Sequence, residues 1–461
     1  MASLAGMLQA RGHHVTGSDA AAYPPMSDVL AGLGIVLHQP YAESNLMPRP
    51  GWSRPDLVIV GNAISRGNVE LEYVLDRRIP FTSMAAVLHD EFLDGRESLV
   101  VTGTHGKTTT TSMLAWIYEM ASRTSAEFAP SFLIGGVAEN FGTSFKVRSG
   151  TRPFILEGDE YDTAFFDKSS KFVHYLPEIA IINNLEFDHA DIFESVAAIQ
   201  LAFKRFINLI PRNGQLLANG DDANLAPLLN VTHCPVKRFG LGEANAWRAE
   251  RITLAPTVTE FEMPSFKFRL NLLGELNVRN ALGVIAAARH CGLKNHQIQE
   301  AFDTFKGVKR RMEVRGVSGG VTVVDDFGHH PTAIRETLRA LRVRFQGQKI
   351  WAVFEPRTNT TRRNVFQSEL VSAFIDADAV VVAQIARLEL LQPAERLDPV
   401  RLMKELKDSG KVASYLPDAD AIVDHLAKNT EGGDVICVFS NGGFGGIHTK
   451  LLDRLNYARR K

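Results

Sequence analysis

The chain has little of what marks a protein for export, for the membrane or for nucleic acid. Its 461 residues include only three cysteines, far apart and without metal-binding spacing, so we expect buried thiols in a reducing compartment. No run reaches the roughly 18 apolar residues that a membrane helix needs. The net charge of −1 gives no reason to expect a nucleic-acid or membrane partner. The start of the chain lacks the charged segment of a signal peptide, and we expect a cytoplasmic protein.

Length and composition narrow the class of protein further. A content of 45% hydrophobic and 22% charged residues is typical of a soluble globular enzyme, and 461 residues predict about three domains. Strand patterns alternate with helical patterns along the chain, which indicates an α/β fold with mostly parallel sheets and right-handed crossovers. We place the domain boundaries near residues 95 and 308, which gives domains 1–95, 96–308 and 309–461.

The expected elements follow from apolar runs and helical periodicity. A nucleotide-binding α/β domain normally opens with a strand and a glycine-rich turn, whereas this chain opens with a helical pattern, so we expect that first segment to be missing. The predicted strands are 12–19, 56–60, 99–101, 153–156, 179–182, 321–324, 350–354, 379–382 and 435–439, and the predicted helices are 1–11, 71–77, 113–118, 192–209, 277–291, 333–344, 366–375, 400–406 and 447–455.

A glycine-rich turn between an expected strand and an expected helix is the strongest functional signal. Residues 103–108 read Gly-Thr-His-Gly-Lys-Thr. Turn glycines let backbone N–H groups converge on phosphate oxygens, Lys107 adds a positive charge, and the Thr108 hydroxyl can hold Mg²⁺. We therefore expect binding of ATP or a similar nucleotide, and the alternative is an ordinary strand–helix turn. The glycines are closer together than in the common phosphate loop.

Two acidic segments follow expected strands. Residues 157–162 hold four carboxylates that would repel one another without a cation or basic group among them, so Glu157 is a candidate Mg²⁺ ligand. In residues 182–191, His189 adjoins acids at a strand end and could ligate a second Mg²⁺ or orient a phosphate. The alternatives are a solvated acidic turn and a structural histidine.

Polar groups also lie near the second domain boundary. Asn277 is a candidate N-cap of the helix expected there. Asn280, one turn later, could contact an adenine edge or lie on the helix surface. Arg311 could close over a polyphosphate, although paired surface arginines are common.

Three polar loops follow strands in the last third of the chain. In residues 325–331 one acid could hold a ribose or a water, His329 could meet a phosphate, and Pro331 suits the first position of a helix; capping alone does not explain both histidines. Arg357 offers a guanidinium for a carboxylate. The glycines of residues 440–448 allow a close backbone approach or an anion-binding nest, and the alternative is a tight connection.

Taken together and in this order, these segments resemble the Mur ligase family, whose members join amino acids or peptides to UDP-N-acetylmuramic acid at the expense of ATP. Residues 103–109 match the family's ATP loop, including its short glycine spacing, and the resemblance covers nearly the whole chain. It implies three α/β domains: an N-terminal Rossmann-like UDP-binding domain, a central P-loop ATPase domain with a mostly parallel sheet, and a C-terminal Rossmann-like domain that brings the amine.

The resemblance also implies roles for residues at matching positions. ATP would be held by Gly103, Thr104, His105, Gly106, Lys107, Thr108 and Thr109, with Asn280 on the adenine, Arg311 on the phosphates and Asp326 on the ribose. Thr108 and Glu157 would bind one Mg²⁺, and Glu157 with His189 a second. The catalytic residues would be Lys107, His189 and His329. The substrates would contact Ser18, Asp19, His330, Arg357, Ser440, Asn441, Gly442 and Gly443.

Several segments resemble those of the family members that join L-alanyl-γ-D-glutamyl-meso-diaminopimelate to UDP-N-acetylmuramate through an acyl phosphate, in cell-wall recycling, and this resemblance implies the same reaction here. The segments are 15–19 with 23–27, 160–167, 184–193, 355–359 and 440–448. We expect no nucleic-acid partner, no membrane insertion and a monomer. The alternatives are the L-alanine-adding ligase of de novo peptidoglycan synthesis, a folylpolyglutamate synthetase, and, from another class, a nucleotide- or UDP-sugar-binding protein without ligase activity.

Two positions depart from the family pattern. Leu276 stands where relatives often have a histidine beside the asparagine. Several relatives use a carbamylated lysine as an Mg²⁺ ligand, and Phe203 stands at that position with Lys204 next to it, so we assign no lysine to this role.

Overall fold

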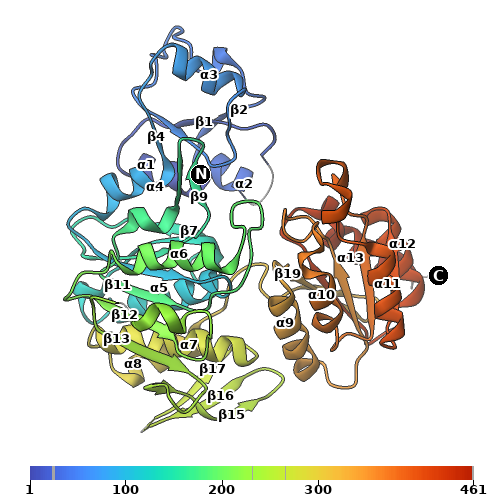
Figure 1. The fold of residues 1–461 in the computed structure, drawn as a ribbon. Coiled ribbons are helices and arrows are strands. Elements are labelled where there is room, and N and C mark those ends of the chain that lie inside the picture. The colour runs from blue at the N-terminus through green and yellow to red at the C-terminus, as the bar shows by residue number, and fades with distance from the viewer. Residues whose placement is uncertain (23–25, 231, 265, 459–461) are drawn as a thin grey trace. The chain divides into compact units, whose positions relative to one another are not determined.

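The fold is taken from a computed structural model, which describes residues 1–22, 26–230, 232–264 and 266–458 (Figure 1). Residues 23–25, which belong to one of the segments that favour the tripeptide reaction, lie outside these ranges. The chain divides into two compact units. The first comprises residues 1–187, 195–248 and 279–305, and the second comprises residues 188–194, 249–278 and 306–461.

The N-terminal part of the first unit contains short strands in two parallel pairs. Strand β1 (Thr16–Ser18) pairs with β2 (Val36–His38), and β3 (Val58–Val60) pairs with β4 (Phe81–Ser83). The strands predicted at 12–19 and 56–60 are therefore present, but shorter than expected. The helices of this part are α1 (Ala2–Ala10), α2 (Met26–Gly32), α3 (Val69–Asp76) and α4 (Met84–Leu88).

A mostly parallel sheet forms the centre of the first unit, as the sequence predicts. Its eight strands follow in the order β14 (Trp247–Arg248), β13 (Val236–Gly240), β12 (Gln215–Asn219), β11 (Ile179–Ile182), β5 (Glu97–Thr102), β8 (Pro153–Glu157), β6 (Ser131–Ala138) and β7 (Thr143–Lys146). Among these strands β6 and β7 are antiparallel, and the other neighbours are parallel. The apolar run of β5 is buried, and the strand lies in the interior of the sheet between β11 and β8.

Helices of the first unit follow these strands, and one begins later than predicted. Helix α5 (Lys107–Ala121) follows β5 directly, whereas α6 (Val196–Ile207) replaces the longer helix expected at 192–209. Ser195 ends the preceding loop, because its hydroxyl accepts a hydrogen bond from the N–H of Ala198 and so caps α6. The unit also contains the hairpin of β9 (Asp162–Ala164) and β10 (Asp167–Ser170), and α8 (Asn295–Thr304).

The prediction that Asn277 caps a helix is wrong. Helix α7 (Glu275–His290) begins before Asn277, and the Asn277 side chain donates to the carbonyl of Leu273 at 2.8 Å. A donor that reaches back one turn to a carbonyl belongs to a residue inside the helix rather than to its cap.

The second unit combines a small antiparallel sheet with a larger parallel one. The small sheet contains β15 (Glu250–Leu254), β16 (Thr259–Met263) and β17 (Phe266–Leu270). The larger sheet has six strands in the order β18 (Glu313–Ser318), β19 (Val321–Asp326), β23 (Val435–Phe439), β20 (Ile350–Phe354), β21 (Ala379–Ala383) and β22 (Val412–Leu416). Among these, β18 is antiparallel to β19 and the others run parallel.

Helices cover both faces of the six-stranded sheet (Figure 1). Successive strand residues point to opposite faces, so Val324 of β19 packs in one buried cluster and Val323 in the other. The first cluster includes residues of α9 (Pro331–Arg344), α10 (Gln367–Ala373) and α11 (Pro399–Asp408), and the second includes residues of α12 (Ala419–Asn429) and α13 (Ile447–Ala458). Pro331 is the first residue of α9, as predicted.

None of the helices in the described part of the chain is both long enough and apolar enough to span a bilayer. The three cysteines are free thiols: Cys234 and Cys437 are buried and Cys291 is half-buried.

Candidate active site

The phosphate loop connects β5 to α5, and its conformation requires both glycines. Gly103 and Gly106 have φ values of 132° and 77°, which other residues rarely adopt. A Cβ on Gly106 would lie 3.0 Å from Nδ2 of Asn183 and closer still to Oδ1 of Asn280. No side chain of the described residues caps α5 at Gly106, so the first N–H groups of α5 are placed to meet an anion.

The carboxyl end of β11 holds this loop in place. Oδ1 of Asn184 accepts from the N–H of His105 at 2.7 Å, and Nδ2 of Asn184 donates to the His105 carbonyl at 3.2 Å. The Thr104 hydroxyl accepts from the N–H of Glu186 at 2.8 Å and lies 3.2 Å from its carbonyl. The residues that follow β11 therefore hold the loop through several hydrogen bonds, which sequence reasoning missed because the two segments are about 80 residues apart.

The basic group expected among the acids of residues 157–162 is present as three lysines. Lys107 donates to both carboxylate oxygens of Glu160, at 2.9 and 2.7 Å. Lys171 pairs with Asp159, and Lys168 pairs with Asp162, each at 2.6 Å. Burial by itself would lower the pKa of Lys107, but the carboxylates of Glu160, Asp159 and Glu157 raise it overall, so the ammonium stays charged.

Glu157, the fourth acid, meets the phosphate loop directly. The hydroxyl of Thr108 donates to its Oε1 at 3.1 Å, and the N–H of Gly135 donates to its Oε2 at 2.7 Å. A hydroxyl and a carboxylate beside a phosphate loop are hard oxygen ligands, so these two residues fit Mg²⁺. His189, the third predicted ligand, lies in the segment 188–194 of the second unit, and its pairing with Glu157 stays a prediction.

Asn280, which is predicted to contact the adenine, lies beside the phosphate loop in the first unit. It is buried within α7, and its Oδ1 lies 3.4 Å from Nδ2 of Asn183. Asn183 also donates to the hydroxyl of Thr110 at 3.0 Å, so it connects α7 with α5. Phe203, at the position of the family's carbamylated lysine, is fully buried, whereas Lys204 is exposed.

Sequence reasoning missed one polar segment at the edge of the central sheet. Asn219 is the last residue of β12, and Asp222 follows that strand, in the same pattern as the segments that were singled out. Asp222 accepts from the N–H of Leu185 at 2.7 Å, and Asn219 donates to the Asn183 carbonyl at 2.9 Å. Burial raises the pKa of Asp222. These side chains brace the segment that in turn holds the phosphate loop.

The acids at the end of β19 in the second unit differ in environment. Asp326 accepts from the N–H groups of Gly328 and Met312, at 2.7 and 2.8 Å, and its burial raises its pKa although the charge of Arg311 opposes this. For Asp325 burial acts the same way, but His448 and Arg310 outweigh it and lower the pKa. Arg311 and Asp326, both predicted to contact ATP, are thus brought together.

The two histidines after β19 have separate surroundings. Nε2 of His329 lies 3.6 Å from Oδ2 of Asp188. Burial alone would raise the pKa of Asp188, but the three histidines around it, His329, His189 and His330, hold it well below its usual range. Nδ1 of His330 accepts from the N–H of Thr332 at 3.2 Å and caps α9, so capping explains the second histidine after all.

The structure brings the two late loops of the second unit together. The Arg357 guanidinium lies against Gly442, where a Cβ would be 2.7 Å from its Cζ. The Ser440 hydroxyl donates to Glu355, and the Ser440 carbonyl accepts from Arg310 at 2.6 Å. The Arg357 side chain remains 49% exposed.

The same loop contains an unmatched polar atom. Oδ1 of Asn441 is buried, and no described group donates a hydrogen bond to it. A guanidinium that is open to solvent and a carbonyl oxygen that needs a donor match a ligand with a carboxylate and an amine. Gly443 is exposed next to them.

Ser18 and Asp19, predicted to contact a substrate, lie at the carboxyl end of β1. The Asp19 carboxylate accepts from the N–H of Ala21 at 2.9 Å, and its own N–H donates to the His38 carbonyl at 3.1 Å. This is the edge where ligands bind in open parallel sheets.

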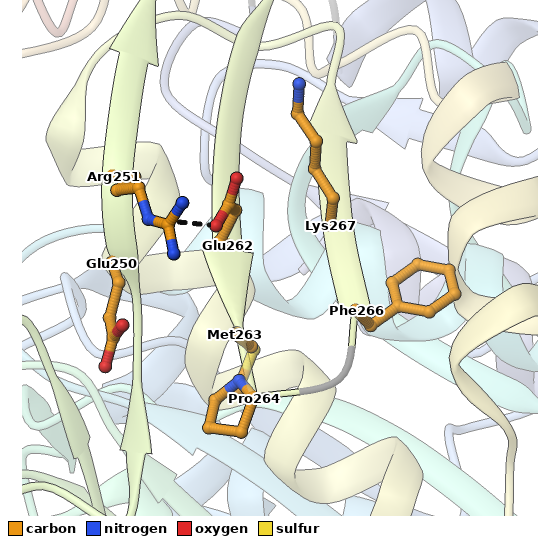
Figure 2. A pocket seen from close by; sticks show the side chains of 7 residues that line it. All are labelled: Glu250, Arg251, Glu262, Met263, Pro264, Phe266 and Lys267. Atoms are coloured by element: carbon orange, nitrogen blue, oxygen red, sulfur yellow. Dashed lines mark ion pairs between the residues drawn. The ribbon is translucent and has the colours of Figure 1, made fainter.

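A pocket elsewhere in the second unit contains none of the predicted site residues. Figure 2 shows it over the antiparallel sheet of β15, β16 and β17, with the ion pair of Arg251 and Glu262 at 3.1 Å on its wall. It is lined by Glu250, Arg251, Glu262, Met263, Pro264, Phe266 and Lys267. The candidate site lies instead at the carboxyl ends of parallel strands.

Three family models match the chain in succession. The Mur ligase family, catalytic domain, matches residues 1–94; the Mur ligase middle domain matches residues 101–288; and the Mur ligase, glutamate ligase domain, matches residues 310–442. The chain belongs to the Mur ligase family. Its α/β class and three-domain Mur ligase architecture are those predicted from the sequence, and as a member of this family it is a ligase.

Individual Mur ligases resemble the chain over almost its whole length. A protein of Escherichia coli K12 named UDP-N-acetylmuramate–L-alanyl-γ-D-glutamyl-meso-2,6-diaminoheptandioate ligase is 43% identical over 99% of this chain and 96% of its own. A UDP-N-acetylmuramate–L-alanine ligase of Acetivibrio thermocellus is 33% identical over 96% of this chain and 91% of its own. A crystal structure of a murein peptide ligase from Psychrobacter arcticus 273-4 has a TM-score of 0.73 and 35% identity, and the match covers 99% of this chain and 96% of that one.

Proposed function

We propose that this Mur ligase joins L-alanyl-γ-D-glutamyl-meso-diaminopimelate to UDP-N-acetylmuramate at the expense of ATP, in peptidoglycan recycling. The observation that carries the proposal is the junction of the two late loops, where the exposed Arg357 guanidinium lies against Gly442 next to the unmatched Oδ1 of Asn441. The tripeptide carries both carboxylates and amines. The 43% identity to a ligase named for this tripeptide supports the same reading.

The reaction begins with the nucleotide. The backbone N–H groups at the start of α5 and the ammonium of Lys107 hold the phosphates, and Asn280 contacts the adenine. Arg311 and Asp326 hold the phosphates and the ribose. Thr108, Glu157 and His189 would hold Mg²⁺. The chemistry that Mg²⁺ supplies when bound is neutralisation of the phosphate charge.

Two displacements then form the amide. The lactyl carboxylate of UDP-N-acetylmuramate attacks the γ-phosphorus of ATP, so that an acyl phosphate forms and ADP leaves. The tripeptide amine attacks the acyl carbon, the C–N bond forms, and phosphate departs while the amine loses a proton. Lys107 and His329 stabilise the charge of the transferred phosphoryl group.

Substrate contacts divide between the ends of the chain. Ser18 and Asp19 contact the UDP-sugar at the edge of β1. Arg357 and residues 440–443 receive the tripeptide. His330 also contacts a substrate, and its Nδ1 caps α9. We place the enzyme in the cytoplasm, since its three cysteines are free thiols and ATP is supplied there, and we propose that it is a monomer.

Isotope transfer tests the acyl phosphate. With ¹⁸O in the lactyl carboxylate of UDP-N-acetylmuramate, one labelled oxygen should appear in the released phosphate, because the acyl C–O bond breaks in the second step. Mass spectrometry of the phosphate and of the amide product measures this transfer. Unlabelled phosphate accompanied by amide formation would exclude the mechanism.

Asn184→Ala should weaken nucleotide binding about tenfold, because it removes two hydrogen bonds that fix the His105 peptide in the phosphate loop. The dissociation constant of ADP by calorimetry measures this effect. Asn68→Ala is the matched control: it also removes two hydrogen bonds to the backbone, both accepted by Asn68 from N–H groups at the start of α3, and should leave ADP binding unchanged. Equal effects in the two variants would contradict the role of Asn184.

Arg357→Lys should raise the KM for the tripeptide by about 10–100-fold, because lysine keeps the charge but loses the planar fork that binds a carboxylate through two hydrogen bonds. Steady-state kinetics at saturating ATP and UDP-sugar measure the change. Arg363→Lys, on an arginine that pairs with Glu395 at 2.7 Å, should leave this KM unchanged. An unaltered KM in Arg357→Lys would remove this arginine from the tripeptide site.

A further inference from the structure

The lysine proposed to hold the ATP phosphates already has an anionic partner within the protein. Both carboxylate oxygens of Glu160 accept from Nζ of Lys107, at 2.9 and 2.7 Å. The pair is buried: the side chains of Lys107 and Glu160 are 14% and 3% exposed. Two of the three ammonium hydrogens are therefore directed at Glu160.

Glu160 pairs with the lysine of the phosphate loop, whereas the other acids of residues 157–162 have different partners. Asp159 pairs with Lys171 and Asp162 with Lys168, and neither lysine belongs to the phosphate loop. Glu157 accepts from a hydroxyl and from a backbone N–H. Glu160 thus binds the group on which the nucleotide phosphates are expected to compete.

The carboxylate of Glu160 and the nucleotide phosphates cannot both bind Lys107 strongly at the same time. A polyphosphate placed on Lys107 would bring at least two negative charges next to the buried carboxylate of Glu160, and like charges in a site of low dielectric repel strongly. The ammonium also has too few hydrogens to keep two strong bonds to Glu160 and make two to phosphate.

We propose that Glu160 is a positioning residue that occupies Lys107 in the nucleotide-free enzyme and releases it to the phosphates when ATP binds. This inference rests on the proposed nucleotide role of Lys107. Until ATP binds, both carboxylate oxygens of Glu160 hold the ammonium of Lys107 in place. The measured affinity for nucleotide is then the difference between the phosphate–Lys107 and Glu160–Lys107 interactions.

Glu160→Gln tests this competition, because competition and a purely structural role predict changes of ADP affinity in opposite directions. The amide has the size of the carboxylate but no charge, so Lys107 no longer has to leave an ion pair, and ADP should bind about tenfold or more tightly. A purely structural role of Glu160 would predict weaker binding instead. Calorimetric titration with ADP, in EDTA and in Mg²⁺, measures the dissociation constants of the wild-type chain and of the variant.

Asp162→Asn is the matched control, because it removes the same charge from the same segment and frees a lysine that lies outside the phosphate loop. It should leave ADP binding unchanged. If Glu160→Gln fails to fold, Glu160→Asp serves in its place, since a carboxylate shorter by one methylene holds Lys107 less well and should also tighten ADP binding. Unchanged or weaker binding in the folded variant would overturn the role of Glu160. Failure of the wild-type chain to bind ADP would instead overturn the nucleotide site itself.

Discussion

Lys107→Ala should reduce phosphate release by at least about 10²–10³-fold, the loss typical of removing one charge-stabilising donor from an active site. It should also lower the free energy of unfolding by about 3–5 kcal/mol, because it removes the ion-pair partner of the buried Glu160 carboxylate. Steady-state phosphate release and urea denaturation measure the two effects.

A double variant separates these effects. Lys107→Met combined with Glu160→Leu removes both charges of the pair, and an apolar replacement of a buried pair is often neutral for stability. We expect most of the lost stability to return, while phosphate release stays as low as in Lys107→Ala. Turnover in either variant near the wild-type rate would exclude Lys107 from catalysis.

After Lys107→Ala, we expect Gly106→Ala to have the largest effect on stability and nucleotide binding. Alanine in the left-handed conformation of Gly106 costs about 1–2 kcal/mol, and its Cβ would also clash with Asn183 and Asn280. Displacing those side chains adds about 1–3 kcal/mol and moves the loop. We expect a loss of about 2–5 kcal/mol in unfolding free energy and no measurable ADP binding at micromolar ligand.

Gly142→Ala isolates the backbone part of this cost. Gly142 also has a positive φ, 65°, but a Cβ there meets no atom of the described residues within 4 Å. Its free energy of unfolding should fall only by the backbone cost of about 1–2 kcal/mol, and it should bind ADP like the wild-type chain. Equal losses of ADP affinity in the two variants would show that Gly106 is not part of a phosphate cradle.

The sequence predicted the parts of the fold that have strong local signals. Strands β11, β20 and β23 are uninterrupted apolar runs inside parallel sheets, and each was predicted at its observed bounds. Strand β17, Phe266–Leu270, was missed because polar and apolar residues alternate in it, as expected in an antiparallel sheet with one exposed face. The early start assigned to α6 overlooked the capping signal of Ser195.

For the candidate site, residue types were predictable but their partners were not. The glycines, Lys107 and Thr108 form a local pattern that the sequence displays in one stretch. The partner of Lys107 is 53 residues away, and the partner of His105 is 79 residues away. Four acids with several basic residues nearby allow many pairings, and only the fold selects Glu160 for Lys107.

The most direct test of the proposed reaction is a comparison of amine substrates. Phosphate release is measured with Mg-ATP and UDP-N-acetylmuramate, with either the tripeptide L-alanyl-γ-D-glutamyl-meso-diaminopimelate or free L-alanine added. We predict release that depends on both the sugar and the tripeptide, with L-alanine giving no more than the background. Release with L-alanine and not with the tripeptide would contradict this assignment and make the chain a UDP-N-acetylmuramate–L-alanine ligase.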